Sequence, residues 1–286
     1  MSDCMRDWDV WRLVLPGVSP LEVWNLPVMG RELWELLGAP RVDADRRAGV
    51  PESALAGRLG PALAGALSTL VKRHAVEAVW LSGGLVCLEG FGAMLSHVAT
   101  ALPCPVYVAE RPLFAPAQAG LRLLAPLAPA QPVALDVGQT GIKCVSHTAA
   151  PRIFERDTAL LPRYFIGMAR PPDRRHVQAA VAFIASALRV FSAQAPDALC
   201  LALPCPLDAS LIPGGCTYGW EGHASLVADI LQAAMGNEGR GGTALVLNDA
   251  ELATEAARRD SRLANHSRVL CLTLGFGPGG ALLERR

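Results

Sequence analysis

Short apolar runs alternate with stretches of helical spacing along most of the chain, and this pattern predicts its elements. Leucine and valine recur every three or four residues between Leu55 and Val71, which predicts a helix over 51–74. By the same reasoning we expect further helices at 31–37, 91–102, 116–124, 174–193, 223–235 and 250–259. Short runs of aliphatic residues predict strands at 10–15, 78–81, 105–109, 133–135, 142–147, 198–203, 244–247, 269–274 and 281–283.

The predicted strands and helices alternate, which is typical of the α/β class. The chain has 286 residues, 51% apolar and 18% charged, so it is long enough for two lobes and its composition disfavours disorder. A connector rich in proline and alanine, APLAPAQ at 125–131, is the best candidate boundary in the first half. Residues 1–50 give the weakest pattern, because proline and glycine interrupt it.

The charge balance narrows the range of partners. The 26 basic and 26 acidic residues cancel and form no basic run, so we expect neither nucleic acid nor a membrane as partner. The longest apolar stretches, 121–135 and 181–190, are broken and too short to span a bilayer. The first residues carry acids and tryptophans, which is not the pattern of a signal peptide. These features predict a cytoplasmic protein.

Eight cysteines are scattered without a CxxC pair, the usual pattern of reduced thiols in a cytoplasmic protein. Those inside predicted strands or helices are expected to be small buried residues. Cys200, Cys205 and Cys216 leave a zinc site as a weaker alternative, because their spacing is irregular and no histidine pair follows.

Four predicted strands end on glycine or on an acidic residue. In PVALDVGQTGIK the strand ends on Asp136, and a turn of small residues follows. Glycine lets backbone N–H groups approach an anion, Thr140 adds a hydroxyl donor, and the aspartate can hold a hydrated Mg²⁺. The other ends are Asn248-Asp249, the turn 275–280, and Ser82-Gly83-Gly84. Ligands of α/β sheets collect at the carboxyl ends of strands, so all four can face one cleft.

Each feature also has an ordinary structural interpretation. A glycine cluster between apolar runs is most often a hairpin turn, and Asn-Asp before a helix is most often an N-cap. Gly-Gly after a strand carries little information, whereas DxGxTxxK after a strand is more specific for phosphate. Lys143 in this motif either reaches phosphate or faces solvent from the outgoing strand.

Together the motifs resemble the superfamily of ATPases that includes actin, hexokinase and the large heat-shock chaperones, and within it the ROK family of bacterial sugar kinases. VALDVGQTGIK resembles the phosphate-1 hairpin, ALVLNDAELATEA the catalytic strand and helix, and LCLTLGFGPGGALL the phosphate-2 hairpin. LALPCPLD resembles the PGPVD-type turn, and TYGWEGHASLVADIL the segment that borders the sugar. The resemblance covers residues 132–283 and implies a two-lobed ribonuclease H-like (actin-like ATPase) fold.

The order of the remaining motifs implies a circular permutation. In the family the adenosine strand ending in Gly-Gly follows phosphate-2, whereas here AVWLSGGL, PVYVAE and APAQAGLRLLA stand in the first half. One lobe is then expected to comprise residues 1–125 plus 266–286, and the other residues 130–265. The permutation also predicts that residues 271–283 pair in one sheet with a strand from residues 8–15.

The resemblance implies an ATP- and Mg²⁺-dependent kinase that phosphorylates a sugar or sugar-like hydroxyl, with the nucleotide between the lobes. Asp249 would be the general base, Asn248 would orient another hydroxyl, and Asp136 would hold Mg²⁺ through water. Because Asp249 opens a helix, its carboxylate is expected to stay ionised. The implied nucleotide-binding set is Asp136, Gly138, Gln139, Thr140, Lys143, Gly83, Gly84, Gly275, Gly277, Gly279 and Gly280. The implied sugar-binding set is Asn248, Asp249, Trp220, Glu221 and His223.

Departures from the family pattern keep other functions open. Gln139 stands where glycine is usual in phosphate-1, Phe276 stands where a small hydroxyl residue is usual in phosphate-2, and Pro278 removes a backbone donor. The zinc motif of many members, with the Glu and His that contact the sugar, is missing from residues 1–50. The main alternative is a catalytically weakened, nucleotide-binding regulatory or structural member of the same fold. A water-using phosphatase or ATPase, or a phosphoryl donor other than ATP, also stays open.

The sequence does not identify the acceptor. Trp220 can equally be a packed aromatic residue, and Glu221 with His223 a helix cap. A transcriptional repressor of the family would carry a helix-turn-helix, which residues 1–50 do not resemble. The expected partner is a small sugar-like molecule, and a homodimer stays open.

Overall fold

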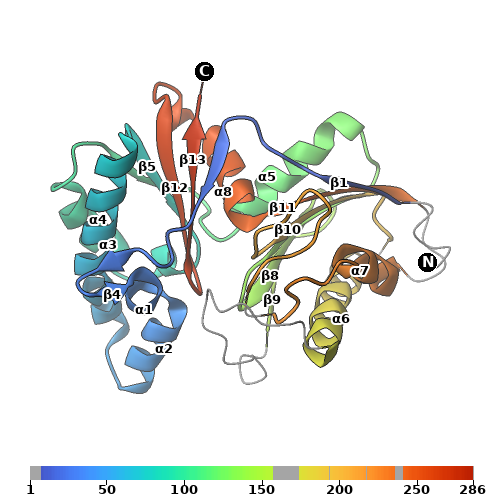
Figure 1. Cartoon of the computed structure of the whole chain (residues 1–286), viewed down its shortest axis with the longest axis horizontal. Helices are drawn as coiled ribbons and strands as arrows, with labels where there is room; N and C mark the ends of the chain where they lie inside the picture. Colours follow the sequence, from blue (N-terminus) through green and yellow to red (C-terminus); the bar gives the residue numbers. More distant parts are fainter. Residues whose placement is uncertain (1–7, 157–173, 193, 217, 236–240, 286) are drawn as a thin grey trace. The chain divides into compact units, whose positions relative to one another are not determined.

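A computed structural model describes residues 8–156, 174–192, 194–216, 218–235 and 241–285 (Figure 1). It confirms the predicted α/β class. The chain divides into two compact units, which are Met1–Val14 with Pro116–Leu252 (unit 1) and Leu15–Ala115 with Ala253–Arg286 (unit 2). These boundaries differ from the predicted lobes, because residues 1–14 and 116–125 belong to unit 1 and residues 253–265 to unit 2.

Unit 1 is built on a six-stranded sheet. Its strand order is β1 (Trp8–Arg12), β11 (Gly242–Asn248), β10 (Ala198–Leu203), β7 (Pro132–Val137), β8 (Gly141–Ser146) and β9 (Arg152–Glu155). The first four strands are parallel, and β8 and β9 continue the sheet antiparallel. β7 and β10 are buried along their whole length, which explains why their sequences are apolar except for Asp136 in β7.

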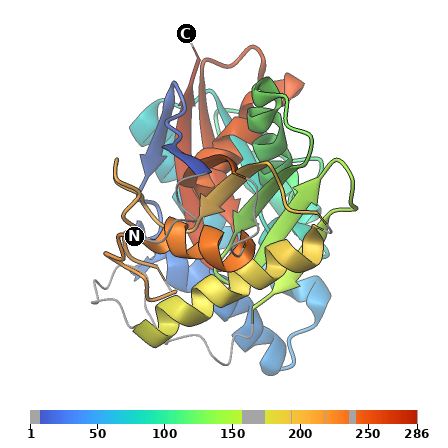
Figure 2. The same ribbon diagram turned by 90° about the vertical axis from the view of Figure 1, so that its right-hand side faces the viewer.

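Helices cover both faces of this sheet. α6 (Arg174–Phe191) and α7 (Leu226–Met235) lie side by side (Figure 2) and share one apolar core with Val133, Leu135 and Leu201. α5 (Ala115–Leu124), followed by the 3₁₀ turn Ala125–Leu127, packs on the other face, where Gly120 approaches Ala134 and Cys200 so closely that a methyl group would not fit. Val133 and Leu135 of β7 therefore face α6 and α7, whereas Ala134 between them faces α5.

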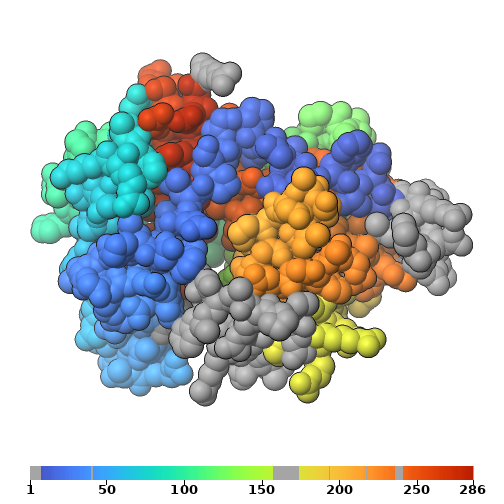
Figure 3. All heavy atoms as spheres, in the orientation of Figure 1, coloured from blue at the N-terminus to red at the C-terminus, as the bar shows by residue number. Residues whose placement is uncertain are grey.

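Unit 2 has a five-stranded sheet in the order β2 (Val18–Leu21), β13 (Pro278–Glu284), β12 (Arg268–Leu274), β5 (Ala78–Ser82) and β6 (Val106–Val108). β12, β5 and β6 are parallel, whereas β13 is antiparallel to both of its neighbours. The remaining elements of this unit are the small sheet β3 (Pro27–Val28) and β4 (Arg31–Glu32), α1 (Leu33–Leu37), α2 (Ala39–Arg47), α3 (Glu52–His74), α4 (Phe91–Ala99), and the 3₁₀ turns Leu85–Cys87 and Ser261–Leu263. α2 lies on the surface of the unit (Figure 3).

α3 is the central helix of unit 2. It is long and apolar enough to cross a membrane by length and composition, but more than half of that stretch is buried in the structure. Its buried face, which includes Leu59, Leu63 and Leu67, belongs to the same core as residues of β5 and β12. This is the arrangement of a core helix in a soluble protein.

The two sheets share one pattern of strand pairing. In the order β9-β8-β7-β10-β11 and in the order β2-β13-β12-β5-β6, two antiparallel pairings are followed by two parallel ones. Each sheet therefore contains an equivalent hairpin, β7–β8 in unit 1 and β12–β13 in unit 2. In unit 1 the hairpin precedes the other three strands of this pattern in the sequence, whereas in unit 2 it follows them.

The predicted pairing of residues 271–283 with a strand from residues 8–15 is wrong. The strand in that region, β1, pairs with β11 in the sheet of unit 1, and β13 pairs instead with β2. A strand pattern fixes which face of a strand is buried but not the sheet that it joins, so the sequence did not separate these two cases. The sequence also missed β2, β9 and α2.

Candidate functional site

The site residues predicted in unit 1 meet at the carboxyl edge of its sheet. β7, β10 and β11 are parallel neighbours, and their register places Asp136 opposite Ala202 and Asn248 opposite Leu203. Asp136 lies near the end of β7 and Asp249 directly follows β11, and only β10 separates these two strands. Two strand spacings put their backbones roughly 10 Å apart. Both residues therefore lie at the carboxyl edge of the sheet, where ligands of parallel α/β sheets bind.

The turn between β7 and β8 is held by its carbonyl groups. Tyr218 Oη donates to the carbonyl of Gly138 at 2.7 Å, the Arg156 guanidinium donates to that of Gln139 at 3.3 Å, and the Arg156 N–H donates to that of Thr140 at 2.8 Å. The Gln139 side chain donates to the carbonyl of Pro204 at 3.1 Å. Gln139 is therefore fixed by hydrogen bonds within the turn.

Asp136 and Lys143 face each other across the hairpin. They are directly paired in the register, and Lys143 Nζ lies 3.3 Å from Asp136 Oδ2. The Asp136 side chain is 8% exposed and that of Lys143 is 21% exposed, so Lys143 is largely buried and paired with a carboxylate. A Cβ atom on Gly138 would lie 2.8 Å from Lys143 Nζ, which places the ammonium group beside the turn. The geometry sets a carboxylate and a cation at one end of the turn.

Asp249 opens α8 (Asp249–Arg258), as predicted, and accepts a hydrogen bond from the N–H of Ala250 at 2.8 Å. Burial raises the pKa of its carboxyl to about 7, and the negative charge of Asp136 adds to this effect against the opposing charge of Lys143. Burial thus works against the ionised form that was expected, because desolvation outweighs the stabilisation by the helix N-terminus. A carboxyl that titrates near neutral pH suits a general base.

Asn248 is used mainly inside the protein. Its Nδ2 donates to the carbonyls of Leu203 and Cys205 at 3.4 and 2.8 Å, and its Oδ1 accepts from the N–H of Ala250 at 2.9 Å. Both donors are engaged, so only a lone pair of Oδ1 remains for a ligand. The side chain ties β10 to β11 and fixes the start of α8 rather than presenting an open amide group.

A buried ion pair supports the same helix start. Glu251 accepts from the N–H of Asn248 at 2.9 Å, and Arg12 of β1 lies 2.9 Å from its carboxylate. Neither Glu251 nor Arg12 was among the predicted site residues. Asn-Asp-Ala-Glu is the spacing of a capping box, and this signal could have identified Glu251. Arg12 could not be found from spacing, because only the pairing of β1 with β11 brings it close to Glu251.

The three predicted sugar contacts have other surroundings. Trp220 is fully buried and stacks on Tyr218, with ring centroids 4.4 Å apart and planes within 6°. His223 Nε2 lies 2.7 Å from Asp229 Oδ2, beside a pocket of about 610 Å³ between α6 and α7. Glu221 lies close to Gly215 in the loop before α7. A fully buried indole cannot touch a ligand, so the structure gives Trp220 a packing role.

The glycines predicted in unit 2 divide into two groups. Gly83 and Gly84 follow β5, and the turn Gly275–Gly277 follows the neighbouring parallel strand β12, so these meet at one sheet edge. Gly83 has φ +100°, and a Cβ atom there would lie 2.4 Å from the carbonyl oxygen of Leu274. Gly279 and Gly280 lie instead within β13, where Gly280 packs against Val23 and Leu272. Gly280 is thus a packing residue.

The turn of unit 2 is also held through its carbonyls. The N–H of Ala39, at the start of α2, donates to the carbonyls of Gly275 and Phe276 at 3.1 and 3.0 Å. Pro278 is the first residue of β13, opposite Leu274. Its missing N–H group therefore falls at the base of the hairpin rather than in the turn itself.

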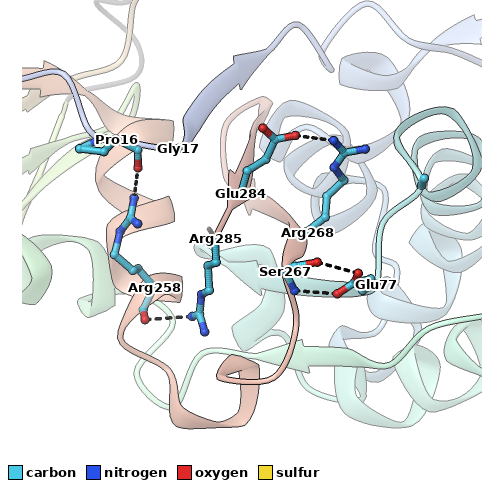
Figure 4. A pocket seen from close by; sticks show the side chains of 9 residues that line it. Pro16, Gly17, Glu77, Arg258, Ser267, Arg268, Glu284 and Arg285 are labelled. Atoms are coloured by element: carbon cyan, nitrogen blue, oxygen red, sulfur yellow. Dashed lines mark hydrogen bonds and ion pairs between the residues drawn. The ribbon is translucent and has the colours of Figure 1, made fainter.

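A charged pocket of about 1050 Å³ lies at the opposite end of the same sheet (Figure 4). Arg268 pairs with Glu284 at 2.6 Å, and Glu77 accepts from the N–H and hydroxyl of Ser267 at 2.6 and 2.7 Å. Arg285 donates to the carbonyls of Leu263 and Arg258. Most polar groups of this pocket hold strand and helix ends together, which favours a structural role.

Comparisons with known proteins add no family to these observations. No model of a known protein family matches the chain, and none of the curated proteins is significantly similar to it.

Proposed function

We propose that the chain has a circularly permuted, actin-like ATPase fold. The shared strand pairing of the two sheets supports this, because a duplicated ribonuclease H-like unit is what the resemblance implies. The hairpin of unit 2 comes after its other strands in the sequence, which is the order that a permutation gives. The pairing that the permutation predicted for residues 8–15 is wrong, because β1 joins the sheet of unit 1, so the proposal now rests on the place of the β12–β13 hairpin in the sequence.

The activity that the site supports best is the phosphorylation of a hydroxyl of a sugar or sugar-like molecule with ATP and Mg²⁺. The observation that carries this is the meeting of Asp136, Lys143, the Gly138–Thr140 turn and Asp249 at one sheet edge. Carboxylate oxygens suit Mg²⁺, and Asp136 would hold it together with its water. When bound, the metal neutralises charge on the phosphate groups.

The protein's own residues would orient the acceptor and move one proton. Asp249 accepts the proton of the attacking hydroxyl while that oxygen bonds to the transferred phosphoryl group and the leaving oxygen departs with the nucleotide. With a pKa of about 7, this carboxyl exchanges its proton near neutral pH, as a general base must. Lys143 contributes a positive charge beside the turn, which favours the developing negative charge on phosphate oxygens.

The proposal is tested with a panel of sugars in the presence of ATP and Mg²⁺, with ADP release as the readout. We expect one or more sugars to raise turnover, and Asp249→Asn to lower that turnover about a hundredfold or more while ATP still binds. Asp43→Asn, at a carboxylate with 52% side-chain exposure, is the matched control and should behave as wild type. If no sugar raises turnover and Asp249→Asn equals wild type, the kinase proposal fails.

A nucleotide-binding regulatory member of the fold is the second candidate. Three observations favour it: Lys143 already pairs with Asp136, the amide of Asn248 is engaged, and Trp220 is buried away from any ligand. The two candidates differ in a thermal-shift experiment combined with the turnover assay. Stabilisation by ATP and Mg²⁺ without turnover on any sugar would select this second function. In either case we propose a cytoplasmic protein.

A further inference from the structure

Three consecutive carbonyl groups of the β7–β8 turn accept hydrogen bonds from two residues, Tyr218 and Arg156. Those of Gly138, Gln139 and Thr140 accept hydrogen bonds from Tyr218 Oη, the Arg156 guanidinium and the Arg156 N–H respectively. Arg156 directly follows β9, and Tyr218 lies in the loop before α7, so two distant segments hold this turn.

The fixed carbonyls determine where the N–H groups face. In a trans peptide the C=O of one residue and the N–H of the next point in opposite directions, and the described residues contain no cis peptide. The N–H groups of Gln139 and Thr140 must therefore face away from Arg156 and Tyr218. Successive N–H groups on one side of a turn form an anion-binding concavity.

Tyr218 and Arg156 are themselves held firmly. The guanidinium carbon of Arg156 lies 3.6 Å from the centroid of the Tyr218 ring. The Tyr218 ring also stacks on the buried Trp220, with ring centroids 4.4 Å apart. Burial raises the pKa of the Tyr218 phenol, so it remains a hydrogen-bond donor at neutral pH. Within the described residues no carboxylate pairs with the Arg156 guanidinium. Among the described residues, the Arg156 guanidinium is therefore engaged with the turn and with the Tyr218 ring.

We propose that Arg156 and Tyr218 are positioning residues that preset the Gly138–Thr140 turn for the phosphates of a nucleoside triphosphate. This inference rests on the proposed function and deepens it. It also explains how the turn tolerates Gln139, because the side chain and carbonyl of that residue are both tied back to the protein. Trp220 is fully buried and stacks on the ring of Tyr218, so its role here is to hold that ring in place.

Tyr218→Phe is the sharpest test, because it removes one oxygen and keeps both ring contacts. Binding of ATP, inorganic pyrophosphate and adenosine is measured by calorimetry with Mg²⁺. We expect the variant to bind ATP and pyrophosphate about fivefold more weakly, the effect of one lost hydrogen bond. Adenosine affinity should stay within about twofold, because adenosine carries no phosphate for the turn.

Arg156→Met tests the same role at the second residue, so the conclusion does not depend on Tyr218→Phe alone. It removes the guanidinium bond and the stack on Tyr218, and we expect at least about a tenfold loss of pyrophosphate affinity. Arg156→Lys should restore only part of it, since an ammonium group keeps the charge without the planar stack. Arg152→Met is the matched control, because Arg152 stacks on Phe154 at 4.6 Å on the same strand without touching the turn.

The outcomes separate the inference from the proposed function. Equal loss of adenosine and pyrophosphate affinity, or no loss in Tyr218→Phe, overturns the positioning role while the kinase proposal stands on Asp249→Asn. Selective loss of pyrophosphate affinity combined with full turnover in Asp249→Asn supports the positioning role and removes the proposed base. A wild-type protein that binds neither ATP nor pyrophosphate overturns both.

Discussion

Asp249→Asn makes a stability prediction that does not depend on any substrate. Burial raises the pKa of this carboxyl in the folded protein to about 7, from an ordinary value of 3.8. Between these values the folded state binds more protons than the unfolded state, so the free energy of unfolding falls as the pH rises. From pH 5 to pH 8 this amounts to roughly 3 kcal/mol. The asparagine variant has no such carboxyl and should lack this component.

Urea unfolding at pH 5, 6, 7 and 8, followed by tryptophan fluorescence, measures the effect. The variant should gain stability relative to wild type as the pH rises, with most of the gain complete by about pH 7, where the folded-state carboxyl ionises. Asp43→Asn serves as the control and should run parallel to wild type, because its carboxylate is 52% exposed. Parallel pH curves for wild type and Asp249→Asn would refute the burial and the charge coupling on which the proposed base rests.

Three further predictions concern a glycine turn, a buried ion pair and the buried cysteines. The first two are measured by urea unfolding and the third by thiol labelling. Gly83→Ala should cost about 2 kcal/mol or more, because the position combines φ +100° with a backbone contact, whereas Gly84→Ala at φ −70° should cost little. Arg12→Met leaves the buried Glu251 carboxylate uncompensated and should cost about 3 kcal/mol; a loss below about 1 kcal/mol would show a surface-type pair. Burial raises the pKa of three thiols to about 12, so in the native protein iodoacetamide at pH 8 should modify exposed Cys87 and spare Cys144, Cys200 and Cys271. Native labelling of those three thiols would contradict their burial.

Local signals predicted the elements that carry the candidate site. β7 and β10 are buried on both faces and so appear as plain apolar runs, and Asp249 lies at a helix start, as its sequence indicates. β9 was missed because four residues with two charged ends, RIFE, give no clear alternation. α2 was missed because APRVDADRR has no apolar stripe.

Pairing and electrostatics were beyond the reach of the sequence. Nothing in WDVWR indicates that β1 joins β11 rather than β13, because register and partner depend on the assembled sheet. The pKa of Asp249 depends on burial and on Asp136, more than a hundred residues away in the chain. Tyr218 and Arg156 likewise reach the turn only after the fold has formed.

The placement of the β12–β13 hairpin has a consequence for synthesis of the protein. β12 is the middle strand of the unit 2 sheet, yet it follows β2, β5 and β6 in the sequence. On the ribosome, β2 and β5 are made long before the two strands that must lie between them. Unit 2 therefore cannot complete its sheet during translation of its first hundred residues. Its apolar strands must wait for the last segment, and premature release of the nascent chain would leave them open to aggregation.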